Sequence, residues 1–131
     1  MTLRIVVTGK TGQVGKALCA RLKGDHKVIT LGRNDLDLET WEITSSLIDA
    51  CVPDLIINAA AYTDVEKAED EEDIAYRINT ELPERLAKQA NRHNAGFIHF
   101  STDYVFDGTK LEPYIETDIP NPINAYGRSK L

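Results

Sequence analysis

Tyr126 and Lys130 have the types and the spacing that proton transfer requires. The two residues are four apart, so on a helix their side chains share one face. A phenol can donate a proton to an oxygen on which negative charge develops, and a nearby cation lowers its ordinary pKa of about 10. The pair therefore predicts a tyrosine general acid assisted by a lysine, although the same spacing also occurs on ordinary surface helices.

Hydroxyl groups that suit the same chemistry follow a short apolar run. Thr102, or in its place Ser101, could hydrogen-bond a carbonyl oxygen and align it. A ketone that is reduced by hydride transfer builds negative charge on its oxygen, where the phenol proton is needed. The hydride requires a cofactor, and the ammonium group of Lys130 would then also hold the ribose of a nicotinamide.

A glycine-rich turn near the N-terminus offers a place for such a cofactor. Gly9, Gly12 and Gly15 stand in the order G-x-x-G-x-x-G between a strand-like run and a helix-like run. In a dinucleotide-binding turn the first glycine permits the tight turn, the second admits the pyrophosphate, and the third lets helix and strand pack closely. Free N–H groups of the helix then attract the anion. The alternative is a turn without a ligand, in which Lys10 is a solvated lysine and not an added positive charge.

The end of the second strand-like run bears on which dinucleotide is bound. An acidic residue there binds the adenosine ribose hydroxyl of NAD, whereas an arginine suits the 2′-phosphate of NADP. Gly32 stands where the acid is expected and Arg33 follows it, which favours NADP(H) over NAD(H). Asp35 and Asp37 keep NAD(H) open, because the register of a loop cannot be read from sequence. Arg33 could also be a surface arginine without a ligand.

Strand-like and helix-like segments alternate along the chain. Short connections between them imply parallel strands and right-handed crossovers. We therefore expect one doubly wound, Rossmann-type α/β domain over residues 1–131, with helices on both faces of a parallel sheet that stops after its fourth strand. The expected strands are 3–8, 27–31, 55–60 and 96–101, and the expected helices are 12–23, 40–52, a long helix after the acidic run 66–73, and the start of another at the C-terminus.

The long helix contains a proline, so we expect it to be split. With a break near Thr80, this residue would cap the second half and Pro83 would fall in the first turn, where its missing N–H costs little. The acidic run 66–73 indicates a solvated helix start, and no metal site is expected there. In this helix an apolar stripe at helical spacing is formed by Ile74, Ile78, Leu82, Leu86 and Ala90. In the helix before it, the spacing predicts inward side chains at Trp41, Leu47, Ile48 and Cys51.

Composition narrows the class of protein. Hydrophobic residues make up 42% and charged residues 27%, which is typical of a soluble globular chain. The net charge of −6 argues against a nucleic-acid partner. No apolar run is long enough for a membrane span or a signal peptide, and only two cysteines occur, Cys19 and Cys51. These features predict a cytoplasmic protein with no membrane partner.

Four motifs resemble the dTDP-4-dehydrorhamnose reductase family, in the extended branch of the short-chain dehydrogenase/reductase superfamily. They are Gly-Lys-Thr-Gly-Gln-Val-Gly from residue 9, Asn-Ala-Ala-Ala-Tyr-Thr-Asp-Val-Glu-Lys-Ala-Glu from residue 58, Ser-Thr-Asp-Tyr-Val-Phe-Asp-Gly from residue 101, and Asn-Ala-Tyr-Gly-Arg-Ser-Lys from residue 124. The resemblance implies reduction of the 4-keto group of a dTDP-linked deoxysugar, which yields dTDP-L-rhamnose, with a nucleotide-sugar as the substrate.

The resemblance also implies roles for individual residues. The catalytic residues would be Thr102, Tyr126 and Lys130, and the substrate neighbours Thr102 and Asp103. The pyrophosphate would meet Gly12, Gln13 and Val14, and the rest of the cofactor Asp37, Leu38, Ala60, Ala61 and Tyr62, with Asp37 and Leu38 at the adenine. The acid that some members carry at the end of the second strand is absent, which puts the use of NAD in doubt.

Other functions share this architecture. A non-catalytic NADP-binding relative, the regulatory subunit of methionine adenosyltransferase, keeps the fold, and so do nucleotide-sugar epimerases and dehydratases. An intact Thr102, Tyr126 and Lys130 favours an enzyme, and the string Ser-Thr-Asp-Tyr-Val-Phe favours the reductase.

The family is roughly twice as long as this chain and has a C-terminal substrate domain. We therefore expect an N-terminal part that is inactive alone, and we leave a homodimer of the full-length form open. A helix that stops just after Lys130 would fix Tyr126 poorly unless other contacts hold it.

Overall fold

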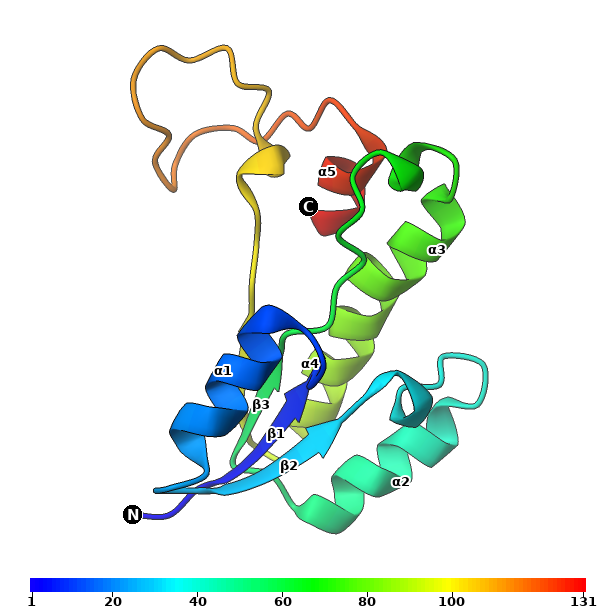
Figure 1. Ribbon diagram of the computed structural model, residues 1–131, viewed down its shortest axis with the longest axis vertical. Coiled ribbons are helices and arrows are strands. Elements are labelled where there is room, and N and C mark those ends of the chain that lie inside the picture. Colours follow the sequence, from blue (N-terminus) through cyan, green and yellow to red (C-terminus); the bar gives the residue numbers. More distant parts are fainter. The chain divides into compact units, whose positions relative to one another are not determined.

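Four short, mostly apolar runs form a parallel β-sheet in the computed structural model, which describes all residues 1–131 (Figure 1). Their β-branched residues suit strands that are covered on both faces. The strands are β1 (Arg4–Thr8), β2 (Lys27–Leu31), β3 (Leu55–Asn58) and β4 (Gly96–His99). The four predicted strands are confirmed, although β3 and β4 each end two residues earlier than expected.

The strands lie in the order β2-β1-β3-β4, and all three pairings are parallel. The register places their last residues in one row across the sheet: Leu31, Thr8, Asn58 and His99. The segment that follows each strand therefore leaves from the same edge, which is where open parallel sheets bind their ligands. This is the doubly wound α/β architecture that the alternation of segments predicts.

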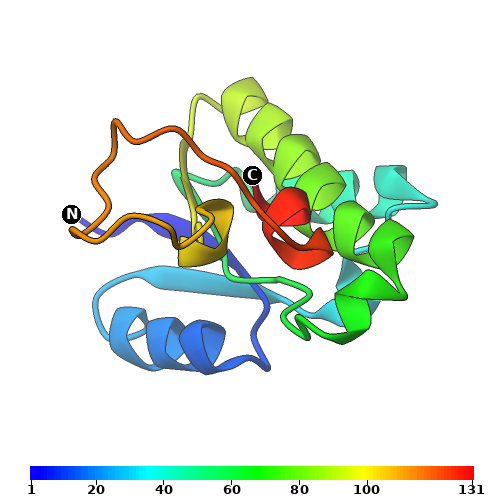
Figure 2. The same cartoon turned by 90° about the horizontal axis from the view of Figure 1, so that it is seen from above.

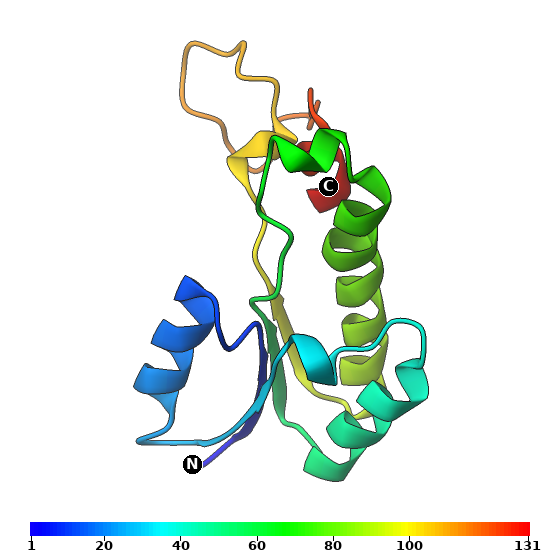
Figure 3. The same cartoon turned by 45° about the vertical axis from the view of Figure 1, so that its right-hand side comes forward.

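Helices cover both faces of the sheet within a compact unit made of residues 1–61 and 82–100. Figure 3 shows α1 (Gln13–Leu22) on one side of the sheet and α2 (Trp41–Cys51) and α4 (Leu82–Arg92) on the other. The α1 face buries Ile5, Val7, Cys19 and Ile57. The opposite face carries the larger cluster, whose buried members are Val6, Leu31, Ile48, Ile56, Leu82, Leu86 and Ala90.

Helix α2 turns three of its four predicted side chains, Trp41, Ile48 and Cys51, toward the core. Ile48 is buried as expected, but Leu47 is 41% exposed. Thr44 takes an inward position instead, and its hydroxyl accepts the N–H of Asp37 and donates to the carbonyl oxygen of Asp35. A polar side chain with both bonds satisfied can occupy the core, and a hydropathy pattern does not reveal it.

The predicted break at Thr80 is wrong. Helix α3 (Glu72–Tyr76), the π-helical segment η3 (Arg77–Glu81) and α4 follow one another without interruption. Pro83 has no N–H for the carbonyl of Asn79, four residues earlier, and its ring presses on that carbonyl in an ordinary α-helix. A wider π turn just before the proline relieves this conflict. Thr80 forms no cap, because its hydroxyl donates to the carbonyl oxygen of Ser129 at 2.6 Å.

The second compact unit consists of residues 62–81 and 101–131, and its apolar core is much smaller. Besides α3 and η3 it contains the 3-10 turns η2 (Lys67–Glu69) and η4 (Asp103–Val105) and the short helix α5 (Ala125–Lys130). Figure 2 shows α5 beside α3. The apolar cluster in this unit is made of Ala68, Ala75 and Ala125, with Tyr62 and Tyr126 packed against them.

Two further features complete the fold. Helix α2 ends at Cys51, before Pro53 as predicted, and its C-cap Val52 has a left-handed φ of 43°. None of the helices combines the length and the apolar surface that a membrane-spanning segment needs.

Candidate functional site

The glycine turn that joins β1 to α1 is too crowded for side chains at two of its three glycines. Gly9 has a φ of 71°, and a Cβ there would lie 2.5 Å from the carbonyl oxygen of Ala59. A Cβ on Gly15 would lie 2.1 Å from the carbonyl oxygen of Gly9. Both distances are far below the separation of about 3.5 Å at which such atoms attract each other. The packing of the fold itself therefore requires glycine at positions 9 and 15.

Gly12 differs from its two neighbours in the motif. It is the N-cap of α1, its φ of −77° is open to any residue, and a Cβ would meet only the carbonyl oxygen of Gly9, at 3.5 Å. The fold does not need a glycine here. No side chain caps the first N–H groups of α1, and Gln13 and Val14 are exposed. An open side next to free N–H groups is the arrangement that a phosphate requires.

The 3-10 turn η1 (Arg33–Asp35) brings a carboxylate back to the end of β2. Oδ2 of Asp35 accepts the N–H of Gly32 at 2.7 Å and lies 3.5 Å from Nζ of Lys10. The stem of Lys10 crosses the open side of Gly32, with Cε only 2.7 Å from the place of a Cβ. Arg33 is exposed and has no hydrogen-bond or ion-pair partner in the chain. Asp35, which the sequence left open as a carboxylate for the ribose, thus does lie at the end of the strand.

Asp37 is engaged by its own loop. Its Oδ1 accepts the N–H groups of Glu39 at 2.8 Å and Thr40 at 3.1 Å, and its Oδ2 accepts the hydroxyl of Thr40. Leu38 packs partly against the larger core cluster, and its carbonyl oxygen accepts Nη1 of Arg85 at 3.2 Å. The hydrogen bonds of Asp37 to Glu39 and Thr40, just before α2, therefore explain its position without a ligand.

A row of polar side chains crosses the carboxyl edge of the sheet. Thr8 donates its hydroxyl to Oδ1 of Asn58, and Nδ2 of Asn58 lies 3.1 Å from Nδ1 of His99. The N–H of Ala60 donates to the same Oδ1 of Asn58 at 3.2 Å. This network fixes the exit of β3, from which Ala60 and Ala61 are predicted to line a cofactor. Sequence reasoning assigned no role to Thr8 or His99, and their place at the ends of the two strands that flank β3 is the signal that could have found them.

Helix α5 carries Tyr126 and Lys130, as predicted. The side chain of Asn124 caps it by accepting the N–H of Gly127 at 2.7 Å. Lys130 is only 9% exposed, and burial lowers the pKa of its ammonium group. Tyr126 is half-buried, and its ring meets that of Tyr104 edge to face, with 5.5 Å between the ring centroids.

The turn η4 packs against α5. Thr102 is the N-cap of η4, and its Oγ1 accepts the N–H of Tyr104 at 3.2 Å and lies 3.2 Å from Oδ1 of Asp103, to which it donates. Gly127 approaches this turn so closely that a Cβ would lie 2.2 Å from the carbonyl oxygen of Tyr104. The structure thus brings the turn of Thr102 and Asp103 to the helix of Tyr126. Tyr104, which joins them, lies in the motif Ser-Thr-Asp-Tyr-Val-Phe-Asp-Gly, although the sequence alone does not predict its role.

Polar contacts from η3 hold the short helix α5. Asn79 is 2% exposed, and its Nδ2 donates to Oγ of Ser129 at 2.9 Å and to the carbonyl oxygen of Tyr62 at 3.0 Å. Its Oδ1 accepts the N–H of Tyr62 at 2.8 Å. Together with the bond from Thr80 to Ser129, these contacts supply the support that a helix of this length lacks.

The acidic run 66–73 does more than begin a helix. Oε1 of Glu69 accepts the N–H of Ala125 at 2.7 Å, and Glu72 forms an ion pair with Arg128. Both contacts join the run to α5. From the sequence we expected these carboxylates to be solvated. Their partners lie on a helix more than fifty residues later, and a local pattern does not reveal this contact.

Tyr62 is held at its backbone by Asn79 and at its phenol by Glu71. The phenol donates to Oε2 of Glu71, and this hydrogen bond raises the pKa of Tyr62 to about 12. With its hydroxyl satisfied inside the unit, Tyr62 can offer a ring face to a ligand and not a proton.

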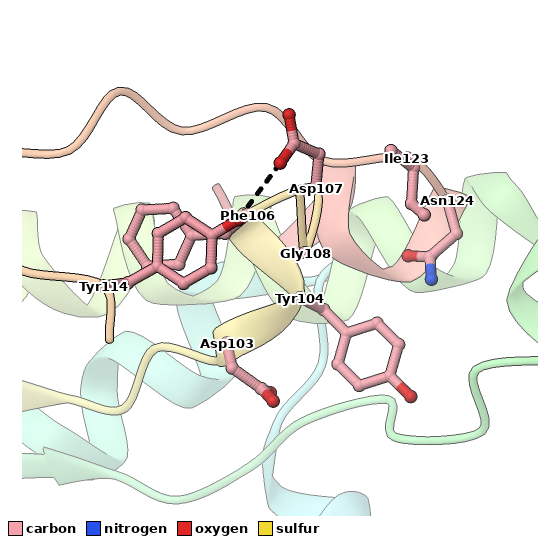
Figure 4. Close-up of a pocket in the computed structure, with 8 residues that line it drawn as sticks. All are labelled: Asp103, Tyr104, Phe106, Asp107, Gly108, Tyr114, Ile123 and Asn124. Carbon is pink, nitrogen blue, oxygen red and sulfur yellow. Dashed lines mark hydrogen bonds between the residues drawn. The ribbon is translucent and has the colours of Figure 1, made fainter. Parts of the chain in front are cut away.

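A pocket of about 270 Å³ lies beside η4 (Figure 4). The rings of Phe106 and Tyr114 stack 4.2 Å apart on one side of it, and the hydroxyl of Tyr114 donates to Oδ1 of Asp107 at 3.1 Å. In Figure 4 the side chains of Asp103 and Tyr104 point away from Asp107, on the other side of the turn. The lining residues are Asp103, Tyr104, Phe106, Asp107, Gly108, Tyr114, Ile123 and Asn124.

Comparison with known proteins assigns the chain to a family. Residues 3–131 match a family model described as the RmlD substrate binding domain. The chain belongs to this RmlD family. The resemblance indicated by the four motifs is therefore confirmed.

Relatives in this family include the dTDP-4-dehydrorhamnose reductase of Aggregatibacter actinomycetemcomitans, which is 45% identical over 129 residues that cover 97% of this chain and 44% of the relative. The dTDP-4-dehydrorhamnose reductase from Sinorhizobium fredii is 46% identical over 129 residues, which cover 98% of this chain and 44% of that relative. A crystal structure of dTDP-4-dehydrorhamnose reductase from Bacillus anthracis in complex with NADP has a TM-score of 0.93 at 37% identity, covering 99% of this chain and 47% of that one. This RmlD family chain thus spans less than half the length of these relatives and shares their fold.

Proposed function

We propose that this RmlD family chain binds NADP(H) and carries the proton-donating residues of a reductase that converts dTDP-4-dehydrorhamnose to dTDP-L-rhamnose. The observation that carries the proposal is the packing of α5 on η4, because it puts Tyr126 at the turn of Thr102 and keeps Lys130 buried on the same helix. The names of the relatives support the substrate, and the NADP complex of the Bacillus anthracis protein supports the cofactor.

Backbone groups would hold the pyrophosphate of the cofactor. The open side of Gly12 and the uncapped start of α1 fit an anion. The packing of the fold does not require a glycine at position 12, whereas a Cβ there would fill the space that a phosphate needs. The exposed guanidinium of Arg33 would hold the 2′-phosphate. When bound, NADPH supplies the hydride that reduces the ketone. We assign the remaining contacts to Gly9, Gln13, Val14, Gly15, Asp37, Leu38, Ala60, Ala61 and Tyr62.

The proton would come from Tyr126. As the carbonyl carbon gains a hydride, its oxygen gains negative charge, and the phenol donates its proton there while the hydroxyl of Thr102 aligns the oxygen. Asp103 would contact the sugar. The ammonium group of Lys130 stabilises the phenolate that remains and would hold the nicotinamide ribose. Because burial lowers the pKa of Lys130, this assistance is lost at a lower pH than the ordinary lysine pKa of about 10.4.

Cofactor binding can be measured on the chain itself. Titration with NADPH, followed by its fluorescence, should show saturable binding. Gly12→Ala should weaken this binding about tenfold or more, because the methyl group blocks the approach of the phosphate to backbone N–H groups. Gly24→Ala is a matched control, since a Cβ at Gly24 meets nothing within 4 Å. An unchanged affinity in Gly12→Ala would remove the glycine turn from its proposed role, and the absence of NADPH binding would overturn the cofactor assignment.

The proton donor is best tested in a longer chain. Residues 1–131 can replace the matching part of the Aggregatibacter actinomycetemcomitans reductase, and NADPH oxidation with dTDP-4-dehydrorhamnose can then be followed. Tyr126→Phe should reduce turnover about 100-fold or more while the affinity for NADPH changes little, because only the proton is removed. Tyr76→Phe, at a 55% exposed tyrosine on α3, is the control. Retention of most of the turnover in Tyr126→Phe would contradict the assignment.

A further inference from the structure

Three charged groups surround the end of β2, where the proposed function places the adenosine ribose. Arg33 is exposed and without a partner, whereas Lys10 and Asp35 face each other at 3.5 Å. Both side chains of this pair are partly exposed, 43% for Lys10 and 36% for Asp35. Asp35 is anchored by the N–H of Gly32 at 2.7 Å, so Lys10 is the member that can move.

The Lys10–Asp35 pair is loose. A charged hydrogen bond between nitrogen and oxygen is about 2.7–2.9 Å long, and the observed distance is well beyond that. Exposed ion pairs of this kind add little to stability. An anion of higher charge that binds beside Gly32 can therefore break the Lys10–Asp35 ion pair with little loss of stability. The 2′-phosphate of NADP carries a charge of about −1.5 to −2 at neutral pH, compared with the single charge of a carboxylate.

We propose that Lys10 and Asp35 form a switch that sets the preference between NADP(H) and NAD(H). This inference rests on the proposed function. With NADP(H), Lys10 leaves Asp35 and joins Arg33 on the 2′-phosphate, which places two cations on the dianion. With NAD(H), Lys10 stays on Asp35, and a free lone pair of this carboxylate accepts the ribose 2′-hydroxyl.

The carboxylate of Asp35 has enough hydrogen-bond acceptor positions for the state with NAD(H). A carboxylate has about four acceptor positions, and the N–H of Gly32 and the ammonium group of Lys10 use two of them. In the NADP(H) state Lys10 has left Asp35, and the negative charge of Asp35 repels the 2′-phosphate. Lys10 therefore favours NADP(H) by attraction, whereas Asp35 opposes it by repulsion.

Two substitutions separate the two roles. Lys10→Met should lower the preference for NADPH over NADH about tenfold, because one charge-assisted contact with the phosphate is lost. Asp35→Asn should raise it by about the same factor, since the repulsion disappears and the 2′-hydroxyl loses a charged acceptor. The amide oxygen of asparagine can still accept the N–H of Gly32, so η1 should keep its shape. Preference is the ratio of the NADH and NADPH dissociation constants, each measured by fluorescence titration.

Matched controls exclude a general effect of charge. Lys23→Met and Asp25→Asn change the same charges beyond the C-terminal end of α1, away from the glycine turn. We expect both controls to keep the preference within about twofold, since exposed charges beyond a Debye length of about 8 Å are screened at physiological salt. Urea unfolding of each variant checks that the fold persists.

The outcomes distinguish this inference from the proposed function. If NADPH binds but Lys10→Met and Asp35→Asn leave the preference unchanged, or if the controls shift it equally, the switch is overturned and the cofactor assignment stands. If neither nucleotide binds to the unsubstituted chain, the proposed function fails and the switch with it. Opposite shifts in the two variants, with silent controls, support the switch.

Discussion

The two compact units of the chain are stabilised in different ways. The unit of residues 1–61 and 82–100 buries isoleucine, leucine and valine on both faces of its sheet. The unit of residues 62–81 and 101–131 has a cluster of three buried alanines and depends on polar contacts such as those of Asn79 and Glu69. Its proposed proton donor, Tyr126, thus sits on a helix that is positioned by hydrogen bonds more than by apolar burial.

This difference has a consequence for stability. Apolar burial tolerates changes of shape as long as volume is kept, whereas a buried hydrogen-bonded group has one acceptable arrangement. Segments with few buried apolar contacts are usually the first to open in the native state. We therefore expect the second unit to open more readily than the sheet, and we expect its polar contacts to determine how often.

The largest effect should come from the core of the sheet unit. Leu86 is fully buried in the larger cluster, and Leu86→Ala should lower the free energy of unfolding by about 2–5 kcal/mol, because it leaves a cavity. Ile43→Ala, at a 59% exposed position on α2, should change it by less than about 0.5 kcal/mol. Urea unfolding measures both. Equal losses in the two variants would mean that the sheet unit does not depend on this cluster.

The next effect should be confined to the second unit. Asn79→Ala leaves the N–H and the carbonyl group of Tyr62 without their partners and should cost about 2–3 kcal/mol. Hydrogen exchange resolved along the chain should speed up in residues 62–81 and 101–131 and change little in the strands. Asn91→Ala, at an exposed position on α4, is the control. Exchange that rises equally in the strands would show that the two units do not open separately.

A smaller effect, and a stabilising one, should come from Val52. Its φ of 43° is a left-handed conformation that costs a β-branched residue about 1–2 kcal/mol compared with glycine. Val52→Gly should therefore raise the free energy of unfolding by about 1 kcal/mol, after the greater flexibility of glycine in the unfolded chain is subtracted. Thermal and urea unfolding would detect it. A loss of stability would mean that the side chain of Val52, although 49% exposed, packs better than its exposure indicates.

The smallest effect should be a local dependence on pH. Hydrogen bonds from Asn121, the N–H and hydroxyl of Thr109, and Tyr114 lower the pKa of Asp107. A carboxyl group with a lowered pKa adds stability above its unfolded pKa of about 3.9, and this stability is lost as the pH falls below it. The protection of residues 107–121 against exchange, after correction for the pH dependence of the intrinsic exchange rate, should therefore fall in acid. Asp118 contributes in the same direction, so Asp107→Asn should reduce this dependence without abolishing it.

The residue pattern predicts the sheet unit better than the second unit. Runs of β-branched residues and the glycine turn are local signals, and they placed the four strands and α1 to within two residues. The residue types of the candidate site were also readable, because Tyr126 and Lys130 are close in sequence. Three features were not readable: the π turn before Pro83, the inward Thr44, and the contact of Glu69 with Ala125. Each depends on a partner distant in sequence or on a local conflict that a spacing rule does not contain.

The order of the units along the chain matters during synthesis. Residues 62–81 lie between the two stretches of the sheet unit, so they emerge from the ribosome before residues 101–131, with which they pack. At typical rates of about 5–20 residues per second, Glu69 is synthesised roughly three to eleven seconds before Ala125, which lies 56 residues later. The carboxylates of Glu69 and Glu72, which later meet α5, are exposed to water during this time. An acidic segment can wait in water without aggregating, whereas an apolar one of the same length would be a hazard to the nascent protein.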